Sequence, residues 1–183
     1  QSASIAPADK KIYSLRDQTA TVESIPLIAS SIMSKKIASG ADAIVLDVKT
    51  GSGAFMKEID DAIMLAKKMV AIPSITDMNI PLGNAIGTSL EVIESAEILQ
   101  GRGDDRLREL CTAISSNMLH LAGKGSIVEC ERMVEDSINN GSAFEKLCRM
   151  AHAQGGDDGL IRNTDKFPKA QIIYPLKAHK SGY

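Results

Sequence analysis

The chain has 183 residues, of which 44% are hydrophobic and 24% charged, and its formal net charge is -2. A chain of this length can bury a sizeable core, either as one domain or as parts of two. The near-neutral charge gives no electrostatic reason to expect nucleic acid or an anionic membrane as a partner. The sequence has no signal-peptide pattern and no apolar run long enough to span a bilayer, so we expect a cytoplasmic protein.

The cysteines predict neither a disulfide nor a metal site. Cys111, Cys130 and Cys148 are odd in number and form no C-x-x-C pair. The three histidines are far apart and have no carboxylate or cysteine at ligand spacing. We therefore expect reduced thiols and no bound metal.

In the first half of the chain, helical and strand patterns alternate. Pro7 and Asp9 favour a helix start, and a helix over 7–17 is expected. Ser24 is a good N-cap for a second helix, which Gly40 ends at about residue 39. The apolar run over 41–49 is typical of a buried, parallel strand. Helical periodicity returns over 57–71, and a short strand with a turn-rich loop is expected within 73–87.

In the second half, helical patterns dominate and are separated by Gly, Asp or Asn. The expected helices cover residues 89–99, 105–123, 126–139 and 142–154. The segment "AQIIYPL" (170–176) is predicted to be an isolated strand. This order predicts an α/β fold with an all-α section. The chain begins with Gln1, and its last stretch, "PLKAHKSGY", stops just as a new segment begins, so we expect a piece of a longer polypeptide.

Two glycine-containing segments are candidate phosphate loops. "TGSGAF" (50–55) lies between a predicted strand and a predicted helix, where such loops occur. It lacks the third glycine of the dinucleotide fingerprint, since position 56 is Met. A plain turn is at least as good an interpretation. "HKSG" (179–182) has no helix after it and is a weak candidate.

The second predicted helix carries a polar stripe that an ordinary core helix would avoid. Ser31 and Lys35 are i,i+4 neighbours and share a face, and Arg16 lies upstream. Lys and Arg supply only donors, whereas Ser can also accept. These groups suit a pyrimidine-2,4-dione, with the two cations donating to its oxygens and Ser31 accepting from its N–H. A helix edge held by salt bridges explains the same residues equally well.

Three segments resemble the pyrimidine-nucleoside phosphorylase and thymidine phosphorylase family. They are "ADKKIYSLRDQTATVESIPLIASSIMSKK", "GADAIVLDVKTGSGAFM" and "ITDMNIPLGNAIG". The resemblance extends through "LRELC" and "NGSAFEKL" to "AQGGD". It implies reversible phosphorolysis of pyrimidine (deoxy)nucleosides, in nucleoside salvage, to the free base and α-(deoxy)ribose 1-phosphate.

The resemblance also implies the roles of particular residues. The pyrimidine base would be held by Tyr13, Arg16, Ser31 and Lys35, and Phe55 would line the base pocket. Arg16 and Lys35 would be catalytic, because they stabilise the negative charge that grows on the departing base. No cofactor is implied: phosphate is a co-substrate, and a monovalent cation is left open. The expected partners are the nucleoside, phosphate and a second copy in a homodimer formed through the helical lobe.

The family fold has a small helical lobe across a cleft from an α/β lobe, and it is similar to that of anthranilate phosphoribosyltransferase. By resemblance, residues 1–39 belong to the helical lobe, 40–169 to the α/β lobe and 170–183 lead into a C-terminal domain. The polar stripe would then face the cleft.

Three departures from the family pattern stand out. The family's K-x-S-x-G-G phosphate loop normally lies upstream of residue 1 and is absent from this sequence. Gln18 stands where the family usually has a small apolar residue. The segment "MVAIPSITDMN" is shorter than the family's version. The sequence does not decide between thymidine and uridine.

Two other functions remain open from the sequence. A phosphoribosyltransferase of related fold would share the architecture, although the base-binding residues argue against it. A non-catalytic interaction module would need only the helices. An upstream K-x-S-x-G-G segment would favour the phosphorylase, and we expect the 183-residue piece alone to be inactive.

Overall fold

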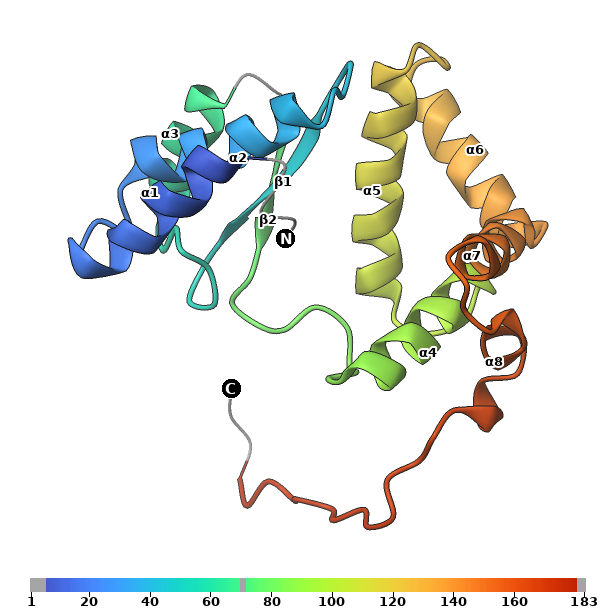
Figure 1. Cartoon of the computed structure of the whole chain (residues 1–183). Coiled ribbons are helices and arrows are strands. Elements are labelled where there is room, and N and C mark those ends of the chain that lie inside the picture. The colour runs from blue at the N-terminus through green and yellow to red at the C-terminus, as the bar shows by residue number, and fades with distance from the viewer. Residues whose placement is uncertain (1–5, 70–71, 181–183) are drawn as a thin grey trace.

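The computed structural model describes residues 6–69 and 72–180, and its backbone forms an α/β fold (Figure 1). The first half contains α1 (Pro7–Gln18), α2 (Ile25–Ala38), β1 (Val45–Thr50), α3 (Ile59–Lys68) and β2 (Ile72–Asp77). The second half contains α4 (Thr88–Leu99), α5 (Asp105–Leu121), α6 (Ile127–Asn139), α7 (Ser142–Ala153), α8 (Asp158–Arg162) and a short 3-10 turn at Thr164–Lys166.

The two strands form a parallel pair joined by α3. Val45 pairs with Ile72 and Thr50 with Asp77, so the carboxyl ends of both strands lie at the same edge. A parallel pair needs such a crossover, which explains why a helix separates the strands in the sequence. Among the described residues, these two strands make up the whole sheet.

A core of small and aliphatic side chains holds the first half together. Ile28 and Ala29 of α2 pack with Val48 of β1 and with Leu65 and Ala66 of α3. Burial of each large aliphatic side chain contributes about 1.5–3 kcal/mol to stability. The core therefore fixes α2 on the strand pair and determines which face of α2 remains for α1.

The helices of the second half are delimited by local capping. The Asp104 carboxylate accepts from the Leu107 amide at the start of α5. Ser126 and Glu129 form a reciprocal capping box at the start of α6. Gly141 has φ of 77° between α6 and α7, a left-handed conformation that favours glycine. A second core, around Ala96 and Cys148, joins α4, α7 and α8.

Most predicted elements are present, with three differences. The strand predicted from residue 41 begins at Val45, and the helix predicted over 57–71 runs only over Ile59–Lys68. Residues 70–71, at the shortened segment, lie outside the described residues. The strand predicted over 170–176 is wrong: this segment is exposed and pairs with no strand among the described residues, so it forms no ladder of backbone hydrogen bonds with them.

None of the described helices combines the length and the apolar character needed to cross a bilayer. The expected boundaries at 39/40 and 169/170 stay predictions. Ile28 and Ala29 share a core with residues on the other side of the first boundary.

Candidate functional site

The predicted polar residues meet where α1 packs against α2. On α1, Asp9, Tyr13 and Arg16 follow i, i+4, i+7 spacing and therefore lie on one face. On α2, Ser31 and Lys35 lie on one face for the same reason. The hydrophobic stripe of α2 is committed to the core, and the polar stripe turns toward α1.

Lys35 is the centre of the polar contacts. Its Nζ donates to the Ser31 Oγ at 2.9 Å and to Oδ2 of Asp9 at 2.9 Å. Ser31 is buried, with 6% of its surface exposed, whereas the Lys35 side chain keeps 30%. The ammonium group is therefore held in place but can still be reached from solvent.

Asp9 is kept ionised by these neighbours. Desolvation alone raises the pKa of Asp9, but the hydrogen bond from Lys35, the nearby Ser31 hydroxyl and the charges of Lys35 and Arg16 outweigh it. The net result is a lowered pKa. At neutral pH, Asp9 therefore serves as an anionic anchor for Lys35.

Arg16 is buried, with 6% of its surface exposed, and it stabilises the turn between α1 and α2. Its Nη2 donates to the carbonyl of Val22, and its Nε donates to the carbonyl of Thr21 at 3.4 Å. The guanidinium has five N–H donors, so these two bonds leave others for a ligand.

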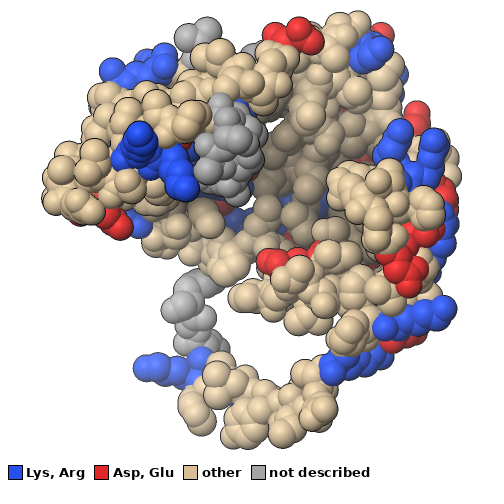
Figure 2. Space-filling view, in the orientation of Figure 1, with Lys and Arg blue, Asp and Glu red and all other residues tan. Residues whose placement is uncertain are grey.

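The Tyr13 ring lies beside both cations. The Arg16 Cζ is 5.1 Å from the ring centroid, and the Lys35 Nζ is 5.8 Å from it. Both distances fall within the range of cation–π attraction, about 6 Å. Two cations, Arg16 and Lys35, therefore lie within reach of one aromatic ring. Figure 2 shows basic side chains on the α1–α2 side of the surface.

The contacts bring four of the five predicted residues together, on the facing sides of α1 and α2. Tyr13 and Arg16 line a small cavity of about 140 Å³ with Ser14, Asp17 and Val22, and Ser31 and Lys35 are not among its lining residues. The polar stripe of α2 faces α1, where Asp9 is a partner of Lys35. That this stripe also borders the cleft between two lobes stays a prediction.

Phe55 lies apart from this cluster. It is exposed, and with Ile28, Ile32 and Met56 it lines a separate cavity of about 160 Å³ that faces the first core. Ile28 and Ile32 form the apolar stripe of α2 that lies next to the stripe of Ser31 and Lys35. Phe55 therefore approaches α2 along this neighbouring apolar stripe.

The "TGSGAF" segment forms a turn with no free cradle of amides. The Gly51 amide donates to the Met56 carbonyl, and the Gly53 amide donates to the Met78 carbonyl. The Ser52 amide donates to Oδ1 of Asn79, and the Ala54 amide donates to the Gly51 carbonyl. A phosphate cradle needs backbone N–H groups that point at the ligand. The structure therefore favours the plain-turn interpretation.

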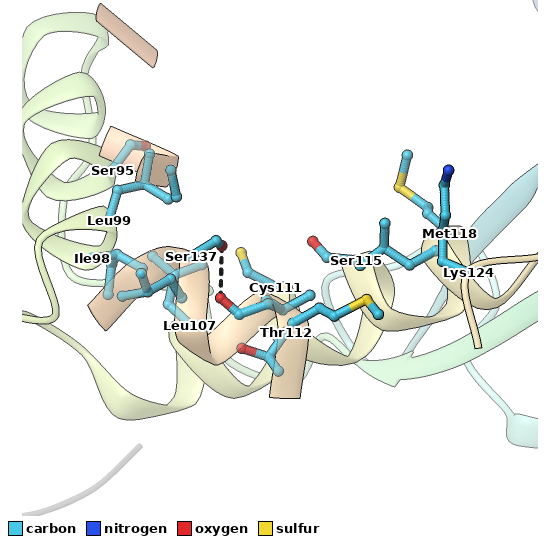
Figure 3. A pocket seen from close by; sticks show the side chains of 15 residues that line it. Ser95, Ile98, Leu99, Leu107, Cys111, Thr112, Ser115, Met118, Lys124 and Ser137 are labelled. Carbon is cyan, nitrogen blue, oxygen red and sulfur yellow. Dashed lines mark hydrogen bonds between the residues drawn. The ribbon is translucent and has the colours of Figure 1, made fainter. Parts of the chain in front are cut away.

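A larger apolar groove lies between α4, α5 and α6 (Figure 3). It has a volume of about 720 Å³, with Lys124 and Met118 at one end and Ser95 and Leu99 at the other. Its lining is mostly aliphatic, and it has no pair of cations such as Arg16 and Lys35. By chemistry, the smaller polar cluster is the better candidate for binding a pyrimidine.

Asp9 is the site residue that the sequence reasoning missed, because it was assigned only to the start of a helix. The i, i+4, i+7 spacing of Asp9, Tyr13 and Arg16 was a usable signal. No described group of His, Cys, Asp and Glu side chains is arranged to hold a metal ion.

Comparison with known proteins agrees with the resemblance read from the residues. The sequence model of the "Glycosyl transferase family, a/b domain" matches residues 1–144. A pyrimidine-nucleoside phosphorylase of Geobacillus stearothermophilus is 51% identical over 193 residues, which cover 100% of this chain and 45% of the relative. A pyrimidine-nucleoside phosphorylase of Staphylococcus aureus (strain USA300) is 52% identical with the same coverage. The predicted family resemblance is confirmed.

The chain thus spans about half the length of these relatives, 45% in both cases. Because 193 aligned positions cover 183 residues, at least ten positions of the first alignment have no residue here. A difference of this size is compatible with the shortened segment "MVAIPSITDMN".

Proposed function

The chain belongs to the glycosyl transferase family and carries its a/b domain, and we propose that it is the base-binding part of a pyrimidine-nucleoside phosphorylase. The complete protein would catalyse the reversible phosphorolysis of pyrimidine (deoxy)nucleosides in nucleoside salvage. Its lobes would enclose the nucleoside and phosphate across a cleft. The observation that carries this proposal is the cluster in which Lys35 joins Ser31 to Asp9 beside the buried Arg16.

The cluster has hydrogen-bonding capacity to spare for a planar dione. Lys35 uses two of its three N–H donors on Ser31 and Asp9, which leaves one among the described contacts. Arg16 keeps N–H donors beyond those bound to the turn. One donor from each cation would meet one ring carbonyl, and the Ser31 oxygen would accept from the ring N–H between them.

The two cations suit the chemical step. As phosphate attacks the anomeric carbon, the C–N bond breaks and its electron pair moves onto the pyrimidine. Arg16 and Lys35 would therefore bind the departing base more strongly in the transition state than in the ground state. The Tyr13 ring, within 5.8 Å of both cations, would keep them together before the substrate arrives.

The 183-residue chain alone would bind the base without turning over nucleoside. Its glycine turn at residues 50–55 has its amides engaged, so the turn does not supply the phosphate site. The phosphate-binding groups would come from the K-x-S-x-G-G segment of the complete polypeptide. Sequencing the gene upstream of Gln1 separates this proposal from the interaction module, which needs no such segment.

The base-binding proposal is tested by replacing Lys35 with methionine and titrating thymine and uracil into the chain. Binding should weaken by about 10- to 100-fold, because a charged hydrogen bond contributes about 1.5–3 kcal/mol. Lys36→Met is the matched control, since the neighbouring lysine is exposed. In the complete enzyme, Lys35→Met should lower kcat/KM for thymidine by a similar factor. Equal binding by both variants and the wild type would exclude Lys35 from the base site.

A further inference from the structure

The apolar groove between α4, α5 and α6 has the size and the lining of a small-molecule site (Figure 3). Its volume is about 720 Å³. Small-molecule sites measure about 300–1,000 Å³ and combine apolar walls with a few polar groups. None of the residues of the candidate base site lines this groove. A ligand bound here would therefore be separate from the proposed nucleoside.

The groove is elongated along α5. Leu107, Cys111, Ser115 and Leu119 follow one another at i,i+4 spacing, so they lie on one face of this helix, and all four line the groove. From Leu107 to Leu119 the helix rises about 18 Å, at about 1.5 Å per residue. Aliphatic and thioether side chains of α4 and α6 form the other walls: Ile98, Leu99, Met133, Val134 and Ile138.

One end of the groove carries a cation. Of the described residues that line the groove, Lys124 is the one with a charged side chain. Its amide donates to the Leu119 carbonyl at 3.0 Å, and the Gly123 amide donates to the His120 carbonyl at 2.9 Å. This Schellman arrangement fixes the backbone of Lys124 beside Leu119 at the end of α5. Lys124 forms no ion pair with the described carboxylates.

A free hydroxyl lies on the same side. The hydroxyls of Ser95, Thr112 and Ser137 donate to oxygens of their own or a neighbouring helix. Within the described part of the chain, the Ser115 hydroxyl has no such partner, and Figure 3 shows Ser115 on the Lys124 side of Cys111. The polar groups that remain for a ligand are therefore gathered at one end, and the rest of the groove is apolar.

We propose that this groove binds a medium-chain carboxylate, with its anionic head at Lys124 and Ser115 and its apolar tail along α5 toward Leu99. The head would meet a cation that has no carboxylate beside it in the groove, and the tail would be removed from water. No lining residue is acidic, so nothing in the groove repels the head. The inference goes beyond the proposed function and shares no residue with the base site.

The experiment titrates dodecanoate, decanoate and dodecanol, each below its micelle concentration, into the chain by calorimetry. Decanoate should bind about 15-fold more weakly than dodecanoate, because each buried methylene contributes about 4-fold in affinity. Lys124→Met should weaken dodecanoate by about 3- to 10-fold, a modest loss because the lysine is exposed. The same variant should leave dodecanol binding unchanged, since this ligand has no charge to lose.

Two further measurements locate the ligand. Lys146→Met, at an exposed position of α7 outside the groove, is the matched control and should bind dodecanoate like the wild type. Cys111 is exposed and lines the groove, whereas Cys130 and Cys148 are buried. Bound dodecanoate should therefore slow the reaction of Cys111 with N-ethylmaleimide in proportion to its occupancy.

The titration is repeated with the complete polypeptide, because the chain covers only 45% of its relatives. Dodecanoate binding that persists there, with Cys111 protected, supports the proposal. Binding that is lost there would show that the rest of the polypeptide fills the groove, and the proposal would be overturned. Equal affinity of dodecanoate for the wild type and Lys124→Met, or no protection of Cys111, would overturn it as well. None of these outcomes affects the base site, which is tested separately by Lys35→Met.

Discussion

At the scale of single residues, the candidate site combines structural and chemical roles in the same side chains. Arg16 was expected to donate to a base, and in the structure it also donates to two carbonyls of the α1–α2 turn. Lys35 was expected to face a cleft, and it is paired with Asp9. Substitutions at these positions therefore affect stability as well as binding, and the two effects need separate measurements.

Arg16→Ala should destabilise the chain by about 2–3 kcal/mol, because two partly buried carbonyls lose a charged donor and the buried aliphatic stem loses its packing. The measurement is the free energy of unfolding from urea denaturation. Arg132→Ala, at an exposed position on α6, is the control and should change stability by less than about 0.5 kcal/mol. Equal stability of the two variants would contradict the structural role of Arg16.

Asp9 should make the stability of the chain depend on acid pH. Its pKa in the folded chain is lowered from an ordinary value of 3.8. The unfolded state therefore binds the proton more readily, and the stabilisation is present above about pH 5 and is lost as pH falls through the lowered pKa. The charged groups that face Asp9 are Lys35 and Arg16.

Urea denaturation of the wild type and Asp9→Asn at several pH values between 7 and 3 would measure this dependence. The wild type should be the more stable protein at pH 7, and the difference should shrink toward pH 3. Other carboxylates with lowered pKa, such as Glu97 and Glu135, act in both proteins and cancel in the difference. A difference that stays constant with pH would show that Asp9 is not stabilised as an anion.

At the scale of elements, the sequence predicted the local structure well and the packing less well. Capping residues and apolar periodicity placed α1, α2 and α4–α7 within two residues of their observed ends. The short α8 was missed, because five residues provide too little periodicity. The strand predicted over 170–176 failed because apolar, β-branched composition alone does not supply a pairing partner.

The candidate site shows the same limit. The i,i+4 spacing placed Ser31 and Lys35 on one face, the donor chemistry added Arg16, and the family resemblance supplied Tyr13 and Phe55. That Asp9 would meet Lys35 depends on how α1 crosses α2, and the pattern of a single helix does not contain this information. The phosphate-loop interpretation of "TGSGAF" likewise depends on where the loop amides point.

Gly53→Ala should disturb the contact between the 50–55 turn and the end of β2. A Cβ at this position would lie 2.7 Å from the Met78 carbonyl oxygen, so the backbone of one segment must move. We expect a loss of about 1–3 kcal/mol in the free energy of unfolding.

Gly40→Ala is the control for this substitution. Gly40 has φ of 72° with nothing near its missing Cβ, so only backbone strain of about 1–2 kcal/mol is added there. Gly53→Ala should also shift the NMR signals of Phe55 and Met78, whereas Gly40→Ala should leave them in place. Unchanged signals in both variants would contradict the close approach of the two segments.

At the scale of the whole molecule, α1 presents two different faces. Asp9, Tyr13 and Arg16 face α2, and the stripe one residue earlier, Ala8, Ile12 and Leu15, is exposed. Figure 1 shows α1 at the outer side of the molecule, away from α5 and α6. An apolar stripe in this position is typical of a protein–protein contact.

We expect this stripe to form the homodimer contact that the family resemblance implies. In a two-fold interface the same surface of each copy is used, so α1 would pack against α1 of the second copy, and one substitution would change both sides. Leu15→Glu places two carboxylates in that contact and should convert a dimer to a monomer in sedimentation equilibrium.

Ile86→Glu is the matched control, since Ile86 is 81% exposed and lies between β2 and α4. Because Leu15 is also exposed, the monomeric variant should keep its circular dichroism spectrum and its thymine binding. A wild-type chain that remains monomeric at high concentration, or a Leu15→Glu variant that still dimerises, would exclude α1 as the interface.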